Sequence, residues 1–134
     1  MAKFLTILSL IGPMIGFTPH TGAQSSAQQT GIAKFYSPGV MAQVARNRHM
    51  KLRTDVDGYA AVLNCTDVGK IVVATINGRK QERYQVLDCS QPYHRADHIR
   101  QRLIIEVDYA SAVRNGFARL GKAPATIRSM EAAH

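Results

Sequence analysis

Tryptophan is absent from the 134-residue chain, and cysteine occurs only twice, as Cys65 and Cys89. Two cysteines cannot build a zinc site by themselves, because a structural zinc ion takes four protein ligands. His94 and His98 have the i, i+4 spacing of two ligands on one helix, but no H-E-x-x-H frame surrounds them. We therefore expect no metal ion and no other cofactor.

The chain also lacks a hydrophobic run as long as a membrane-spanning helix, which needs about 20 residues. Its longest apolar stretch near the start, residues 4–17, covers 14 residues and is interrupted by Gly12 and Pro13. Lys3 precedes this stretch and small residues at 21–23 follow it, which is typical of a secretory signal peptide. We expect residues 1–23 to be a cleaved signal, with an uncleaved anchor as the alternative. The protein is then secreted or periplasmic and keeps no membrane span.

Residues 24–30 are rich in Ser and Gln and contain no apolar run, which predicts a flexible lead-in. Residues 31–130 contain no linker and no repeat, so we expect one domain there. In an oxidising compartment Cys65 and Cys89 can form a disulfide that closes a loop of about 25 residues.

Acidic residues are missing before Asp55, and the whole chain carries a net charge of +8. The basic residues in this acid-free part of the expected domain are Lys34, Arg46, Arg48, Lys51 and Arg53, and a second basic group is Arg95, Arg100 and Arg102. Such a surface attracts nucleic acid, anionic lipid or an acidic wall polymer. Export argues against nucleic acid as the partner. A cationic surface that only keeps the protein soluble is an equally open alternative.

The hydrophobic pattern predicts mostly β-structure. The expected strands are residues 32–36, 59–63, 70–76, 81–87, 103–107 and 125–130, and Asn77-Gly78 is a tight-hairpin signal. Residues 40–54 and 90–101 read as loops, whereas residues 109–120 show the one clear helical stripe. Six short strands with one or two short helices predict a small closed β-barrel.

Two aspartates, Asp88 and Asp108, each follow an apolar, β-rich run that would bring the carboxylate to a surface. Two carboxylates at strand ends are the minimum equipment for acid/base chemistry on a sugar chain. The simpler interpretation is that Asp88 opens a turn and Asp108 caps a helix. Local sequence alone favours the simpler interpretation.

Several short motifs occur in an order that resembles the double-psi β-barrel of the rare lipoprotein A family, whose relatives are the expansins, barwin and family 45 endoglucanase-like proteins. The motifs are residues 31–37 (GIAKFYS), 68–73 (VGKIVV), 77–79 (NGR), 86–92 (VLDCSQP), 105–110 (IEVDYA) and 121–125 (GKAPA). They resemble, in turn, the family's opening G-x-A-S-[WF]-Y strand, its L-G-T-x-V-x-V strand and hairpin, V-x-D-R-G-P, I-D-L-S and the closing G-T-A-P-V. The resemblance implies a six-stranded double-psi β-barrel over residues 31–130.

The resemblance also implies a substrate groove over the barrel. Its residues would be Asp108 as general acid, Asp88 as its partner and Tyr36 against the sugar, with Lys34, Arg46, Arg48 and Arg53 gripping an anionic polymer. The implied function is a monomeric, cell-wall-directed protein that acts on or binds peptidoglycan strands, in the manner of a lytic transglycosylase. The alternatives are an expansin-like wall-binding module without turnover and an envelope interaction module.

The sequence departs from the family pattern at three places. Arg48 stands where the family's loop often carries a glutamate, Ala110 replaces the serine of I-D-L-S, and Ser90-Gln91-Pro92 replaces the G-P turn. Any aromatic surface for sugar would rest on Tyr36, Tyr59, Tyr93 or Tyr109. These departures leave catalysis open while the expected fold is unaffected.

Overall fold

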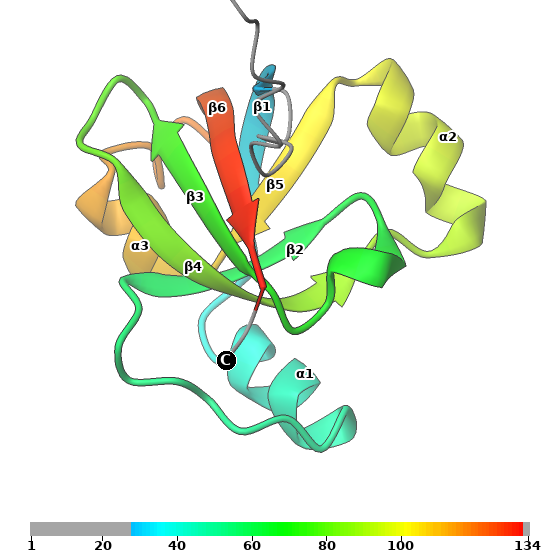
Figure 1. Ribbon diagram of the computed structural model, residues 1–134. Coiled ribbons are helices and arrows are strands. Elements are labelled where there is room, and N and C mark those ends of the chain that lie inside the picture. The colour runs from blue at the N-terminus through cyan, green and yellow to red at the C-terminus, as the bar shows by residue number, and fades with distance from the viewer. Residues whose placement is uncertain (1–27, 133–134) are drawn as a thin grey trace, which may run out of the picture.

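The computed structural model describes residues 28–132, which form a closed barrel of six strands (Figure 1). The strands are β1 (Gln29–Phe35), β2 (Gly58–Val62), β3 (Ile71–Ile76), β4 (Glu82–Cys89), β5 (Leu103–Val107) and β6 (Ala123–Glu131). Around the barrel they follow the order β1-β5-β2-β4-β3-β6. The expected mainly β, six-stranded fold is therefore confirmed, and β1 begins at Gln29, inside the segment predicted as a lead-in. The predicted signal peptide lies outside the described residues.

Two of the six strand pairings are parallel. β1 runs parallel to β5 and β2 runs parallel to β4, whereas the other four pairings are antiparallel. Inward-facing side chains from all six strands fill the barrel, together with Phe117 from the segment between α3 and β6. Tyr84 and Phe117 are among the largest side chains that are fully buried. Burial of this apolar surface is the main favourable term that holds the strands together.

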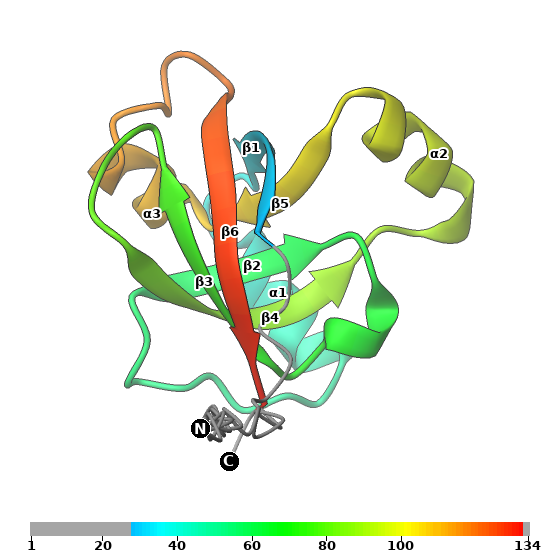
Figure 2. The same cartoon turned by 45° about the horizontal axis from the view of Figure 1, so that its top comes forward.

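Three α-helices surround the barrel, one more than the largest number expected. They are α1 (Val40–Asn47), α2 (Pro92–Arg100) and α3 (Tyr109–Arg114), and a 3-10 turn, η1, spans Cys65–Asp67. Figures 1 and 2 both show α2 and α3 on opposite sides of the barrel, with α2 leading into the start of β5. None of the helices in residues 28–132 is long and apolar enough to cross a membrane.

Three of the predicted loop and helix assignments are corrected. The predicted loop 40–54 contains α1, whose Met41 and Ala45 lie one turn apart and are buried against Leu87 of β4. The predicted loop 90–101 contains α2, which begins at a proline, a residue suited to the first helical turn. The predicted helix 109–120 ends at Arg114, because Gly116 turns the chain with a φ of 74°.

The predicted disulfide between Cys65 and Cys89 is confirmed. It joins η1 to the last residue of β4, one residue beyond Asp88. The bond therefore restrains the end of β4 at the place where the candidate site begins.

Replacing both cysteines with alanine should lower the free energy of unfolding by about 3 kcal/mol, because the unfolded chain regains the entropy of the closed loop. Urea denaturation followed by circular dichroism measures this change. Wild-type protein unfolded in the presence of dithiothreitol is the control and should show the same loss. An unchanged urea midpoint, or two free thiols in the native protein, would contradict the assignment.

Candidate functional site

Four residues form a row across the outer face of the barrel. In the strand registers Lys34 pairs with Glu106, Glu106 pairs with Ala61, and Ala61 pairs with Asp88. Paired residues on neighbouring strands carry their side chains on one face, and adjacent strands lie about 4.8 Å apart. Glu106 and Asp88 therefore stand on either side of one small alanine, with backbones about 10 Å apart.

A β-bulge gives Asp88 this orientation. Ala60 pairs with Val86 and the next residue, Ala61, pairs with Asp88, so Leu87 is an extra residue in β4. Val86 faces the barrel interior and Leu87 faces α1. Simple alternation would turn Asp88 back into the apolar core, whereas the bulge keeps it outside.

The two carboxylates line one cavity of about 210 Å³. Ala61 forms part of its wall, Tyr36 enters from the end of β1, and His94 and His98 enter from α2. Ser90 holds the His98 ring, since its Oγ lies 2.7 Å from Nδ1 of the imidazole. The cavity thus gathers acid, phenol and imidazole groups from β1, β4, β5 and α2.

Both oxygens of the Asp88 carboxylate have partners. Arg48, the residue that ends α1, forms an ion pair of 2.7 Å with Oδ1, and the Tyr36 hydroxyl lies 3.4 Å from Oδ2. The Asp88 side chain is only 16% exposed, so this pairing is partly shielded from solvent. Arg48 therefore binds Asp88 across the edge of the cavity.

Glu106 differs from Asp88 because no hydrogen bond reaches its carboxylate from any other residue within 28–132. Burial raises the pKa of Glu106, and the negative charge of Asp88 raises it further, against the opposing effect of His98, Lys34 and His94. Burial, together with the charges of Glu106 and Asp88, also raises the pKa of Tyr36. Ionisation of Glu106 is therefore less favourable than that of a free glutamate, beside an Asp88 that is paired with Arg48.

Sequence reasoning missed Glu106. The available signal was a lone acid in the apolar strand Leu103–Val107, at an outward position between buried Ile105 and Val107.

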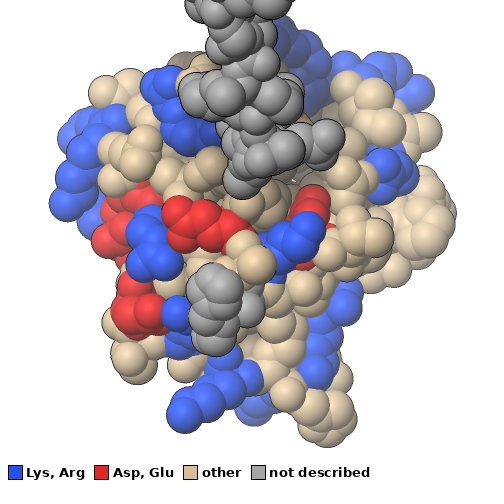
Figure 3. All heavy atoms as spheres, in the orientation of Figure 1, with Lys and Arg blue, Asp and Glu red and all other residues tan. Residues whose placement is uncertain are grey.

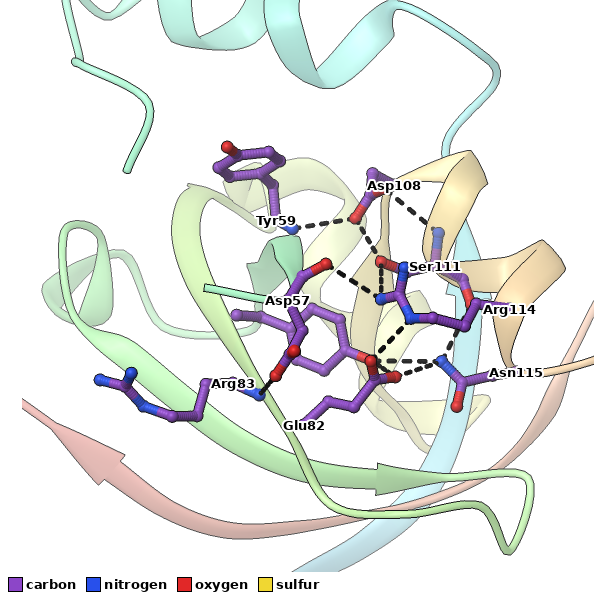
Figure 4. A network of polar contacts seen from close by, with 9 residues as sticks. Asp57, Tyr59, Glu82, Arg83, Asp108, Ser111, Arg114 and Asn115 are labelled. Atoms are coloured by element: carbon purple, nitrogen blue, oxygen red, sulfur yellow. Dashed lines mark hydrogen bonds and ion pairs between the residues drawn. The ribbon is translucent and has the colours of Figure 1, made fainter. Parts of the chain in front are cut away.

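The contacts of Asp108 are those of a helix cap (Figure 4). Its Oδ1 accepts hydrogen bonds from the Tyr59 backbone N–H at 2.9 Å and the Ser111 hydroxyl at 2.6 Å, and its Oδ2 accepts one from the Ser111 N–H at 3.2 Å. It lines a second, more apolar hollow of about 290 Å³ with Tyr59 and Tyr109. A catalytic role for Asp108 stays a prediction, and the structure does not bring it into the cavity of Asp88.

Asp108 belongs to a polar network that fastens α3 to the barrel (Figure 4). Arg114 donates to the Ser111 hydroxyl and forms a 2.7 Å ion pair with Glu82, which is buried on β4. Asn115 donates to Glu82 at 2.7 Å. A buried carboxylate is costly unless it is paired in this way, so the network serves stability.

The other three predicted polymer-gripping residues each have a polar partner outside the two acids of the cavity. Lys34 donates to Gln101, Arg46 to Gln43, and Arg53 to Asp55. Figure 3 shows Lys and Arg scattered over one face, several of them beside Asp or Glu. Of the predicted polymer-gripping residues, only Lys34 and Arg48 lie beside the cavity, through Glu106 and Asp88.

Within residues 28–132 no group of three or more His, Cys, Asp or Glu is arranged to hold a metal ion. His94 and His98 stack on each other, and His98 binds Ser90.

Comparison with known proteins finds similar folds among solved structures. No protein-family model matches the sequence, and no curated protein matches it. Two solved structures of an expansin from Clavibacter michiganensis are similar, each at 16% identity over 77% of this chain and 50% of that chain. The apo form gives a TM-score of 0.49, and a point mutant in complex with cellohexaose gives 0.50.

The likeness identifies the barrel as the double-psi β-barrel fold found in expansin, and it shows the fold alone at this identity. The chain spans about half the length of the expansin. Membership of the rare lipoprotein A family stays a prediction.

Two substitutions of Asp108 separate a cap from a catalyst. Asp108→Asn keeps one oxygen for the two shorter hydrogen bonds, so its melting temperature should stay close to wild type. Asp108→Ala leaves the Tyr59 N–H and α3 without their acceptor and should cost about 1–2 kcal/mol. Thermal and urea unfolding measure both. Loss of a wall-cleaving activity in a fully stable Asp108→Asn protein would instead make Asp108 the catalyst.

Proposed function

We propose that this barrel binds a cell-wall glycan strand in the cavity between Glu106 and Asp88, and that Glu106 is the group that donates a proton to it. The observation that carries the proposal is the register that sets these two acids on either side of Ala61, in a cavity that Tyr36, His94 and His98 also line. The fold adds support, because a similar expansin was solved in complex with cellohexaose. We further propose peptidoglycan as the glycan and lytic cleavage as the reaction.

The two acids suit different parts of such a reaction. Protonated Glu106 can give its proton to the glycosidic oxygen as the bond to the anomeric carbon breaks. The carboxylate left behind can then accept a proton from the sugar's own hydroxyl, as this hydroxyl closes a ring on that carbon. The carboxylate of Asp88, which forms an ion pair with Arg48, stabilises the positive charge that develops on the sugar. No water is needed, and Glu106 ends in its starting state.

Hydrolysis fits this site less well. An inverting hydrolase needs a second carboxylate free to activate water. Both oxygens of Asp88 already have partners in Arg48 and Tyr36. The contacts of Asp88 therefore favour a reaction with one working carboxyl.

The second candidate is an expansin-like module that binds the glycan without cleaving it. The ion pair between Arg48 and Asp88 favours this binding module for two reasons. Arg48 occupies one of the two acids of the cavity, and its cation lies where an anionic group of a polymer could be bound. The overall charge of +8 would assist adsorption to an acidic wall. The disulfide supports placement outside the cytoplasm, where such bonds persist.

Glu106→Gln tests the choice between cleavage and binding. The variant keeps the shape of the side chain but has no proton to donate, so release of anhydro-sugar fragments from purified sacculi should fall at least 100-fold. Binding of the variant to sacculi, measured by co-sedimentation, should remain within about twofold of wild type. Asp108→Asn is the matched control and should retain cleavage. Mass spectrometry identifies the products.

The pH profile of the wild type gives a second readout. Because the pKa of Glu106 is raised on folding, the protonated acid persists to higher pH than for a free glutamate, and cleavage should fall as pH rises through that pKa. Ionising this group in the fold is unfavourable, so Glu106→Gln should unfold at the same or a higher temperature at pH 7.

The wild type decides between the two candidates. If it binds sacculi but releases no fragment at any pH, the protein is the binding module. Wild type that does not bind sacculi contradicts both candidates.

A further inference from the structure

Helix α2 contributes no side chain to the hydrophobic core. None of the residues in Pro92–Arg100 is buried, and the aliphatic Ile99 is 54% exposed. An isolated helix of this length is not stable in water, and most protein helices are held by a buried apolar face. The burial that explains α1 is therefore missing from α2.

Polar contacts hold α2 in its place instead. His98 is bonded to Ser90 at 2.7 Å, and Arg95 donates to the Leu63 carbonyl at 3.1 Å and to Asn64 at 2.6 Å. Gln101, which ends the helix, accepts from Lys34 at 2.7 Å. These contacts tie both halves of α2 to strand ends around the cavity.

The anchored helix presents a line of three rings, which we term the ring ladder: Tyr93, His94 and His98. The centroids of Tyr93 and His94 lie 4.2 Å apart, and those of His94 and His98 lie 5.9 Å apart with their planes at 21°. His94 and His98 line the cavity of Glu106, whereas Tyr93 is 77% exposed. The ring ladder therefore runs from the cavity out to solvent.

We propose that the ring ladder is a sugar-stacking extension of the cavity, on which the glycan continues after it leaves Glu106 and Asp88. This inference rests on the proposed function. The apolar CH face of a sugar ring packs on an aromatic face, and rings already ordered by mutual contact lose little entropy on binding. The imidazoles can in addition bond sugar hydroxyls, since each has a donor and an acceptor nitrogen.

The surroundings of the ring ladder favour a polar chain over an apolar peptide. Beside the rings, α2 carries charged side chains, among them Arg100 paired to Asp97, and it also exposes Ile99. A glycan, with apolar faces and polar edges, matches this alternation.

The test measures, by isothermal titration calorimetry, how tightly the wild type and Tyr93→Ala bind a short and a long ligand. The probes are cellobiose, cellohexaose and the corresponding dimer and hexamer of N-acetylglucosamine. The cavity alone holds the short ligand, and only the long one reaches Tyr93. Wild type should bind a hexamer more tightly than its dimer. Tyr93→Ala should bind the hexamer about five- to tenfold more weakly and the dimer unchanged. Tyr93→Phe should restore hexamer binding.

Ile99→Ala is the matched control, because it removes an exposed apolar side chain from the same helix without touching the ring ladder. It should bind both lengths as wild type does. If Tyr93→Ala binds the hexamer as tightly as the wild type does, the inference is overturned and the proposed function stands. An equal loss for dimer and hexamer also overturns it. Failure of the wild type to bind any of these oligomers or sacculi overturns the proposed function, and the inference with it.

Discussion

The position of β2 between β4 and β5 is the constraint on which the site depends. Both neighbours meet β2 at Ala61, one in a parallel and one in an antiparallel register, so residues 18 positions apart in the sequence face each other across a methyl group. A larger side chain at Ala61 would fill the space between the acids. Barrel closure fixes the strand order, the bulge at Leu87 turns Asp88 outward, and the disulfide one residue later restrains the strand end.

The same arrangement divides the acids into different roles. Asp88 is balanced by Arg48, Asp108 caps α3, and Glu82 is buried with Arg114. Among residues 28–132 Glu106 has no such partner, and it lies half-buried beside a second negative charge, which is the environment that raises a carboxyl pKa. This placement supports the proposed role of Glu106 as the proton donor.

Much of the barrel could be predicted from the sequence, because strand signals are local: β-branched runs, Asn77-Gly78 and two cysteines after apolar stretches. Helices α1 and α2 could not, since one depends on burying Met41 and Ala45 and the other on polar anchors far away in the sequence. That Glu106 rather than Asp108 lines the cavity of Asp88 could not be predicted either, for a related reason. Glu106 and Asp108 are two residues apart in the sequence and lie on the same face of the chain, Glu106 within β5 and Asp108 just after it. Only the hydrogen bonds from Ser111 and Tyr59 show that Asp108 is the helix cap.

Nuclear magnetic resonance tests the central claim most directly, by following backbone amide shifts of the isotope-labelled protein as soluble peptidoglycan fragments or cellohexaose are added. The account predicts that the largest changes fall on Ala61, Ser90 and Glu106, with smaller ones along α2. Changes confined to the second hollow, around Tyr109 and Ala110, would move the binding site to Asp108 and contradict the account.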